Sequence, residues 1–153
     1  MEKERQTVLI VEDQCINREI LKMILQVEYQ VIEAGNGAEA LSILEQNKYI
    51  SAILLDLVMP VMDGYELLTR LRESASASIP TIVMTGEKDV STEQKALDLG
   101  AWDFVSKPYQ PATLMTRLKN VIVRSQFYLL SEMKQLYEPN VLGKLQKPLF
   151  HAG

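Results

Sequence analysis

Short apolar runs alternate with segments of helical periodicity along most of this chain. Runs of consecutive apolar residues that end at a turn signal predict strands buried on both faces, as in a parallel sheet. The clearest run is Ile53-Leu54-Leu55-Asp56, after which Pro60 and Gly64 break the chain within eight residues. The five predicted strands cover residues 8–11, 29–34, 50–55, 81–85 and 102–106.

Helical patterns separate these predicted strands. Apolar residues recur at helical spacing over residues 16–25, 40–44 and 65–71, whereas residues 90–99 are polar and only weakly periodic. A last helix begins near Pro111, a residue that suits a first helical turn. This alternation predicts an α/β fold, namely a doubly wound five-stranded parallel sheet with helices on both faces and right-handed crossovers.

Length and composition indicate one soluble domain with a modest extension. The chain has 153 residues, of which 47% are hydrophobic and 24% charged. No apolar stretch reaches membrane-spanning length and the N-terminus lacks the apolar core of a signal peptide, so we expect a cytoplasmic protein outside the membrane. The single cysteine, Cys15, excludes an internal disulfide. With a net charge of −4, we expect no direct nucleic-acid binding by this chain.

Polar residues follow four of the predicted strands, whose carboxyl ends share one edge of a parallel sheet. Glu12 and Asp13 follow the first strand, and Asp56 follows the third. Thr85 closes the fourth strand, and Lys107 follows the fifth. Clustered carboxylates repel one another unless a cation offsets them, and oxygen ligands are those that Mg²⁺ prefers. Because a metal and an ammonium neutralise phosphoryl oxygens, Asp56 can act there as the nucleophile that forms an acyl phosphate.

An ordered set of motifs resembles the receiver domain of bacterial two-component response regulators. The set covers residues 7–124 and has the order and spacing of that family. It consists of Val11-Glu12-Asp13, Asn17-Arg18, Asp56 with Met59-Pro60 and Asp63-Gly64, Thr85-Gly86, and Gly100-Ala101 through Phe104 to Lys107-Pro108. The resemblance implies the flavodoxin-like receiver fold and a phosphorylation-dependent switch.

The same resemblance implies a role for each matching acidic residue. Asp56 would be the phosphoacceptor, and Asp13 and Asp56 would bind Mg²⁺ directly. The backbone carbonyl of Val58 would be a third protein ligand. Glu12 would act mainly through a metal-bound water.

The remaining matches imply phosphoryl recognition and switching. Lys107 would pair with one phosphoryl oxygen, and the hydroxyl of Thr85 would donate a hydrogen bond to another. Movement of the threonine would free Phe104 to turn inward. Val58 lies two residues past Asp56, and Glu87 lies two residues past Thr85. In the family, residues at these positions influence how water reaches the phosphoryl group. We therefore expect Val58→Asn to change the dephosphorylation rate without abolishing phosphorylation.

The last predicted helix continues to about Tyr137, before Pro139 ends it. We therefore assign residues 1–124 to the receiver domain and residues 125–153 to a C-terminal helical extension and tail. A seven-residue repeat of apolar residues is a partial coiled-coil signature, although polar residues interrupt the companion seam. The repeat consists of Met115, Ile122, Leu129 and Leu136. The extension either packs onto its own domain, forms a homodimer, or links to an effector domain absent from this chain.

Three functions fit these features. The first is a receiver that accepts a phosphoryl group from a sensor histidine kinase or phosphotransfer protein, with only self-phosphorylation and self-dephosphorylation activity. The second is a Mg²⁺-dependent phosphohydrolase with an aspartyl nucleophile, but such enzymes commonly carry a second acid where this chain has Val58. The third is a receiver-like interaction module that does not use phosphate, against which the set Asp13, Asp56, Thr85 and Lys107 argues. The only histidine, His151, is close to the C-terminus and provides no plausible internal phosphohistidine.

Overall fold

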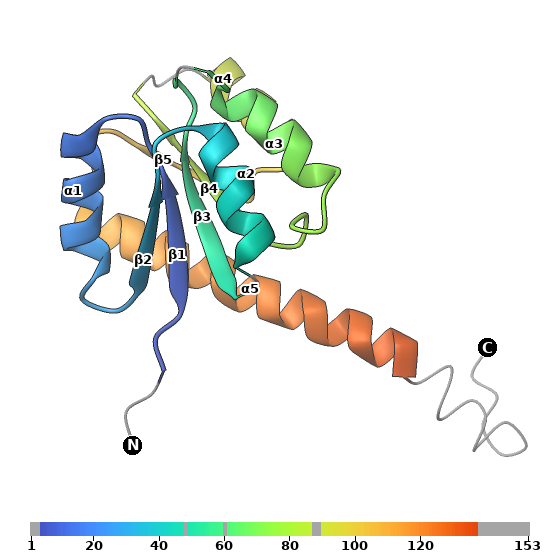
Figure 1. The fold of residues 1–153 in the computed structure, drawn as a ribbon. Helices are drawn as coiled ribbons and strands as arrows, with labels where there is room; N and C mark the ends of the chain where they lie inside the picture. The colour runs from blue at the N-terminus through green and yellow to red at the C-terminus, as the bar shows by residue number, and fades with distance from the viewer. Residues whose placement is uncertain (1–3, 48, 60, 87–89, 138–153) are drawn as a thin grey trace, which may run out of the picture. The chain divides into compact units, whose positions relative to one another are not determined.

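Five strands alternate with five helices in the computed structural model, which describes residues 4–47, 49–59, 61–86 and 90–137 (Figure 1). The strands are β1 (Thr7–Val11), β2 (Gln30–Ala34), β3 (Ile50–Asp56), β4 (Thr81–Thr85) and β5 (Asp103–Ser106). The helices are α1 (Cys15–Leu25), α2 (Gly37–Gln46), α3 (Gly64–Arg72), α4 (Val90–Asp98) and α5 (Pro111–Tyr137). The polar segment with weak periodicity does form a helix, α4.

The strands form one parallel sheet in the order β2-β1-β3-β4-β5. This order places β1 between β2 and β3, so the residues that follow β1 lie between the ends of those two strands. The predicted doubly wound five-stranded sheet is therefore confirmed. Four boundaries differ by one residue, since β1 begins at Thr7, β2 at Gln30 and β5 at Asp103, and β3 ends at Asp56.

Two apolar cores cover the two faces of the sheet, because successive side chains of a strand point to opposite faces. Leu9 and Val11 of β1 belong to the core on the face of α2, α3 and α4. Val8 and Ile10 belong to the other core, which α1 and the first part of α5 complete. With both faces covered, β1, β3 and β4 are buried along nearly their whole length, as in other parallel sheets.

The chain divides into two compact units, Met1–Ile122 and Val123–Gly153, and α5 contributes to both. The proposed boundary at residue 124 stays a prediction. Within the described residues, none of the helices combines the length and the apolar character needed to cross a membrane. The predicted helix stop at Pro139 and the residues Pro60, Glu87 and His151 lie outside the described residues.

Candidate acidic site at the strand ends

Three carboxylates lie together where β1 and β3 end. One carboxylate oxygen from each of Glu12, Asp13 and Asp56 lies within 4.8 Å of the other two. The geometry follows from the topology, because β1 pairs directly with β3, and Val11, the last residue of β1, is the register partner of Leu55, the residue before Asp56. Glu12 and Asp56 are buried, whereas Asp13 is half-buried. The arrangement concentrates negative charge in a place with little solvent.

Glu12 has the most perturbed environment of the three. Burial raises the pKa of its carboxyl above the usual value and the charge of Asp56 adds to this, while a hydrogen bond from the Gln14 N–H and the charge of Lys107 oppose it. Its Oε1 accepts that bond at 3.2 Å and a weaker one from the side chain of Asn17 at 3.4 Å. Its Oε2 is buried without a hydrogen-bond donor among the residues that the structure describes.

Lys107 brings an ammonium to the same site. Its Nζ lies 3.4 Å from Oδ1 of Asp56 and 3.7 Å from Oε2 of Glu12. The position of Lys107 is fixed by the sheet, since its backbone N–H donates to the carbonyl of Thr85 at 2.8 Å. One ammonium thus offsets part of the charge of three carboxylates, and the group retains a net negative charge when all of them are ionised.

Thr85 and Phe104 lie where the sequence predicts them. Thr85 is the buried last residue of β4, and its neighbour Met84 is the register partner of Asp56. Phe104 in β5 is half-buried and packs against the core on the side of α2 and α3. The aromatic ring therefore lies between core and surface, on a strand that β4 separates from β3.

The loop from β3 to α3 forms the other border of the site. The N–H of Val58 donates to Oδ1 of Asp56 at 3.3 Å, while the Val58 side chain is 82% exposed. Asp63 caps α3, because its side chain accepts a hydrogen bond from the N–H of Glu66 at 2.9 Å. Asp63 is therefore a helix-capping residue.

Tyr109 is a site residue that the sequence reasoning missed. Burial raises the pKa of its hydroxyl, and the charges of Glu12 and Asp56 raise it further, so the ring lies close to the acidic group. The hydroxyl is buried without a hydrogen-bond partner among the described residues. The available signal was its position directly after Lys107-Pro108, but a sequence alone does not give the direction of that side chain.

The donor set fits a hard divalent cation. Mg²⁺ is held by oxygen ligands, with one or two carboxylates and retained waters. This site offers three carboxylates within reach of one ion, a buried oxygen of Glu12 without a hydrogen bond, and one open side at the half-buried Asp13. A cation would relieve the repulsion that Lys107 only partly offsets.

Comparison with known proteins identifies the family. Residues 8–119 match the family described as response regulator receiver domain. The chain therefore belongs to the receiver domains of two-component response regulators. The transcriptional regulatory protein SrrA of Staphylococcus aureus is 37% identical over 120 residues, which are 78% of this chain and 48% of SrrA. The chain spans about half the length of the curated relatives it matches.

Solved structures share the fold at similar identity. The chemotaxis protein CheY4 of Vibrio cholerae has a TM-score of 0.72 and 31% identity, covering 77% of this chain and 99% of CheY4. The receiver domain of the sensor histidine kinase PA1611 from Pseudomonas aeruginosa has a TM-score of 0.72 and 29% identity, covering 78% of this chain and 98% of that domain. That structure contains a magnesium ion coordinated in its active site cleft.

Proposed function

We propose that this receiver domain accepts a phosphoryl group on Asp56 and switches conformation in response. The observation that carries the proposal is the group of three carboxylates within 4.8 Å of one another, with the ammonium of Lys107 only 3.4 Å from Asp56. Family membership supports the same function. Asp56 lies nearer to Lys107 than Glu12 does, at 3.4 Å against 3.7 Å, and it accepts a hydrogen bond from the N–H of Val58. Both donors would stabilise negative charge on a transferred phosphoryl group.

The proposed cofactor is Mg²⁺. Asp13, Asp56 and the backbone carbonyl of Val58 would hold it directly, and Glu12 would act mainly through water. Bound there, the ion would supply positive charge to the phosphoryl oxygens. The magnesium ion in the PA1611 receiver structure, together with the fit of the donor set, supports this assignment.

The proposed transfer is a single displacement at phosphorus. A carboxylate oxygen of Asp56 forms a bond to phosphorus while the phosphorus–nitrogen bond of a donor phosphohistidine breaks, and the imidazole leaves with the electron pair and takes up a proton. Lys107 pairs with one phosphoryl oxygen, and the Thr85 hydroxyl donates to another. Attack of water on phosphorus later restores the free carboxylate, so transfer and hydrolysis would be the only chemistry of the domain.

The proposed switch links Thr85 to Phe104. Thr85 lies at the buried end of β4, beside β5, and a hydrogen bond to the phosphoryl group would draw its hydroxyl toward Asp56. Phe104, half-buried at the face of the core, would then turn inward. A buried and an exposed rotamer of one aromatic ring are two discrete states that phosphate contacts can bias.

Two other functions are less well supported. An aspartyl phosphohydrolase would need an acid for the leaving group, and the residue two positions past Asp56 is the exposed Val58. A phosphate-independent interaction module would have no need of the close contacts among Asp56, Glu12 and Lys107.

The test is phosphorylation by a small phosphodonor. The protein is incubated with acetyl phosphate and Mg²⁺, and its intact mass is measured over time. We expect a labile single-phosphate adduct that is lost in Asp56→Asn and without divalent metal, but retained in the control Glu45→Gln, which changes an exposed acid of α2. No adduct with any donor would favour the interaction module, and rapid catalytic turnover of a phosphorylated metabolite would favour the phosphohydrolase.

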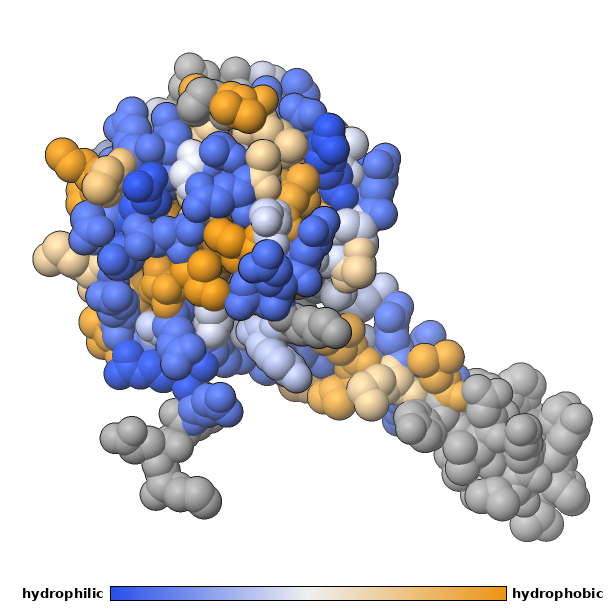
Figure 2. Space-filling model, viewed as in Figure 1, coloured by the Kyte–Doolittle hydropathy of each residue, from blue (hydrophilic) through white to orange (hydrophobic). Residues whose placement is uncertain are grey.

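We propose that a sensor histidine kinase or phosphotransfer protein docks on α1. This helix begins at Cys15, two residues after Asp13, and displays an apolar stripe at spacings of four, three and four residues. Apolar side chains along the left edge of Figure 2 lie over α1. The stripe consists of Ile16, Ile20 and Met23 of α1 and of Val27 in the turn after the helix ends at Leu25. Ile20 is 44% exposed and the others more than 70%.

The stripe fits a helix of the donor protein. A shallow apolar groove of about 460 Å³ continues it, lined by Met23, Ile24, Val27, Glu28, Pro111, Ala112 and Met115. Because the stripe starts beside the acidic site, an amphipathic helix laid along it would bring a neighbouring phosphohistidine toward Asp56. The interaction would take place in the cytoplasm, which we retain as the proposed location.

Transfer from protein donors and from acetyl phosphate distinguishes docking from chemistry. We expect Met23→Asp to slow transfer from purified histidine kinases or phosphotransfer domains at least tenfold and to leave acetyl phosphate labelling unchanged. The matched control is Val90→Asp, since Val90 is 78% exposed on α4. Equal protein-donor rates for both variants would contradict docking on α1.

We further propose that the C-terminal extension forms a homodimer through α5. Beyond Ile122 this helix exposes large apolar side chains, which a second copy of the same helix could bury. They include Phe127, Leu129, Leu130, Met133 and Leu136. We expect the fraction of dimer, measured as mass in solution, to rise with a phosphoryl mimic. The dimer should be lost in the double variant Leu129→Gln/Leu136→Gln, but not in Gln135→Ala. An unchanged monomer mass in all samples would contradict the dimer.

A further inference from the structure

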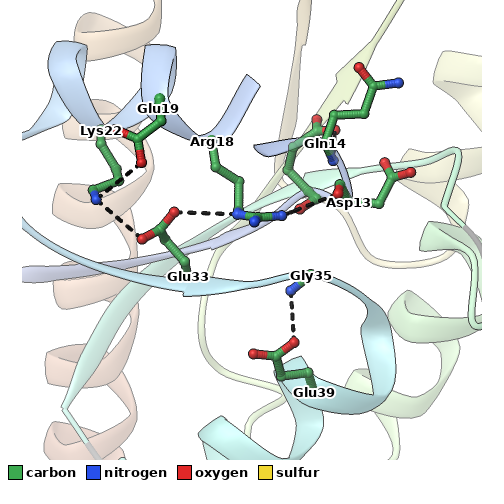
Figure 3. A network of polar contacts seen from close by, with 9 residues as sticks. Asp13, Gln14, Arg18, Glu19, Lys22, Glu33, Gly35 and Glu39 are labelled. Carbon is green, nitrogen blue, oxygen red and sulfur yellow. Dashed lines mark hydrogen bonds and ion pairs between the residues drawn. The ribbon is translucent and has the colours of Figure 1, made fainter. Parts of the chain in front are cut away.

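Arg18 connects the acidic site to the neighbouring strand. Its Nη1 donates to the backbone carbonyls of Glu12 at 2.8 Å and Asp13 at 3.2 Å. Its Nε lies 3.3 Å from Oε1 of Glu33 in β2. Figure 3 shows the guanidinium group between the two, with Glu33 on one side and Asp13 on the other. One side chain thus bonds two of the three residues that carry the clustered carboxylates.

The position of Glu33 is itself fixed. Its Oε2 lies 3.3 Å from Nζ of Lys22, one helical turn after Arg18, and Lys22 also pairs with Glu19 at 3.4 Å. The side chains of Arg18, Lys22 and Glu33 are 22–32% exposed, so the network is partly sheltered from water (Figure 3). Lys22 therefore holds the carboxylate of Glu33 beside Arg18, and that carboxylate balances the positive charge of Arg18.

The segment that carries Glu12 and Asp13 needs such a restraint. It is a short connection between β1 and α1, and its two carboxylates repel each other and Asp56. On one side the sheet holds it, through the N–H of Glu12 bonded to the Ala34 carbonyl at 3.0 Å. The guanidinium holds the carbonyl side of both ligand residues, and so resists a shift of Asp13 away from Asp56.

We propose that Arg18, held by Glu33, is a positioning residue that sets Glu12 and Asp13 at the spacing that a divalent cation requires. The inference rests on the proposed Mg²⁺ site and adds two residues that touch neither the ion nor the phosphoryl group. Groups that orient metal ligands typically contribute tenfold or more to metal affinity. A planar guanidinium suits the task, because it bonds two carbonyls and a carboxylate simultaneously, whereas an ammonium has no fixed fork of donors.

The experiment is isothermal titration calorimetry, in which Mg²⁺ is added to the metal-free protein and to its variants. Arg18→Gln removes a positive charge near the site, so a purely electrostatic role predicts tighter Mg²⁺ binding. The positioning role predicts the opposite, roughly tenfold weaker binding. Arg18→Lys should bind with intermediate affinity, since it keeps the charge but cannot make all three contacts.

Glu33→Gln completes a double-mutant cycle. We expect it to weaken Mg²⁺ binding less than Arg18→Gln, and we expect the double variant to be no weaker than Arg18→Gln alone, because Glu33 acts through Arg18. Additive effects of the two substitutions would contradict a shared role. The matched control is Arg70→Gln in α3, which removes an exposed ion pair with Glu66 of 3.2 Å and should leave the affinity unchanged.

The outcomes separate this inference from the proposed function. Absence of Mg²⁺ binding by the wild-type protein would contradict the metal site itself. Normal wild-type binding with unchanged or tighter binding by Arg18→Gln would contradict only the positioning role. Urea unfolding of the metal-free variants shows which of them are folded. If Arg18→Gln is not folded, the affinities of Arg18→Lys and Glu33→Gln for Mg²⁺ test the positioning role. Affinities of both variants equal to that of the wild type would overturn it.

Discussion

The two borders of the acidic site are built from different chemistry. The β1–α1 side carries two of the carboxylates and is held by charged side chains, with Arg18 bonded to the backbone and to Glu33. The β3–α3 side carries Asp56 and is held by packing, with Met59 and Met62 buried in the core. The difference indicates that ligand geometry depends on polar contacts on one side and on close apolar packing on the other.

On the β3–α3 side, which we call the packed side, Gly64 lies where a side chain does not fit. The N–H of Gly64 donates to the carbonyl of Leu57 at 2.9 Å, which draws the start of α3 against the end of β3. A Cβ on Gly64 would lie 2.6 Å from Cα of Leu57 and 2.8 Å from the carbonyl oxygen of Asp56. Both are backbone atoms, which have no rotamer through which to move away.

The largest effect is therefore expected for Gly64→Ala. We expect a loss of about 2–3 kcal/mol in the free energy of unfolding, measured by urea denaturation, because the loop must shift. The control is Gly86→Ala, where the nearest atom to an added Cβ is Cδ of Lys107 at 4.0 Å. A cost for Gly86→Ala as large as for Gly64→Ala would contradict the account of the β3–α3 side.

On the same side, Val58→Asn should change the lifetime of the phosphoryl group. The side chain of Val58 is exposed beside Asp56, and an amide there can orient an attacking water. We expect dephosphorylation about fivefold faster, on the order of 1 kcal/mol, with phosphorylation retained. The measurement is the half-life of the adduct by intact mass, and an unchanged half-life would contradict control of water access by this position.

On the charged side, Glu12→Gln should stabilise the metal-free protein. Because burial raises the pKa of Glu12 in the folded state, the folded protein binds this proton more tightly, and stability falls as pH rises from the ordinary glutamate value through the raised one. At pH 7 we expect Glu12→Gln to raise the free energy of unfolding by on the order of 1 kcal/mol. This gain disappears when the pH falls below the ordinary pKa of glutamate. Unfolding is measured from pH 4 to pH 8 without metal, and a gain independent of pH would argue against the titration of Glu12 as its cause.

The smallest effect is expected for Val61→Gly. Val61 has a φ of 70°, a left-handed conformation that is costly for a β-branched residue, and its side chain is 84% exposed. Relief of this strain, less the added entropy of a glycine in the unfolded chain, should stabilise the protein by about 0.5–1 kcal/mol. Urea denaturation measures it, and a destabilised variant would mean that the Val61 side chain contributes packing.

Most of the fold could be predicted from the sequence because strand and helix periods alternate clearly. The polar residues at the ends of four strands also predicted the acidic site, since a parallel sheet brings those ends to one edge. The exposed stripe of α1 could not be separated from its buried face, because Ile16 and Ile20 recur at the same helical spacing as Leu21 and Leu25.

Contacts between segments distant in sequence could not be predicted. The ion pair of Arg18 with Glu33 exists because β2 lies beside β1. The sequence around each of the two residues gives no indication of this pairing. The buried hydroxyl of Tyr109 depends on a side-chain direction after β5, and the constraint on Gly64 depends on the approach of two backbones. Each requires the assembled tertiary structure.

The account assigns phosphoryl transfer to one carboxylate of a close group, so the most direct measurement locates the modified residue. After labelling with acetyl phosphate and Mg²⁺, borohydride reduces an acyl phosphate to the corresponding alcohol, and peptide mass spectrometry finds it. We predict a single reduced residue, at Asp56. Reduction at Asp13 or Glu12, or a stable phosphate on a hydroxyl such as Thr85, would contradict the central assignment.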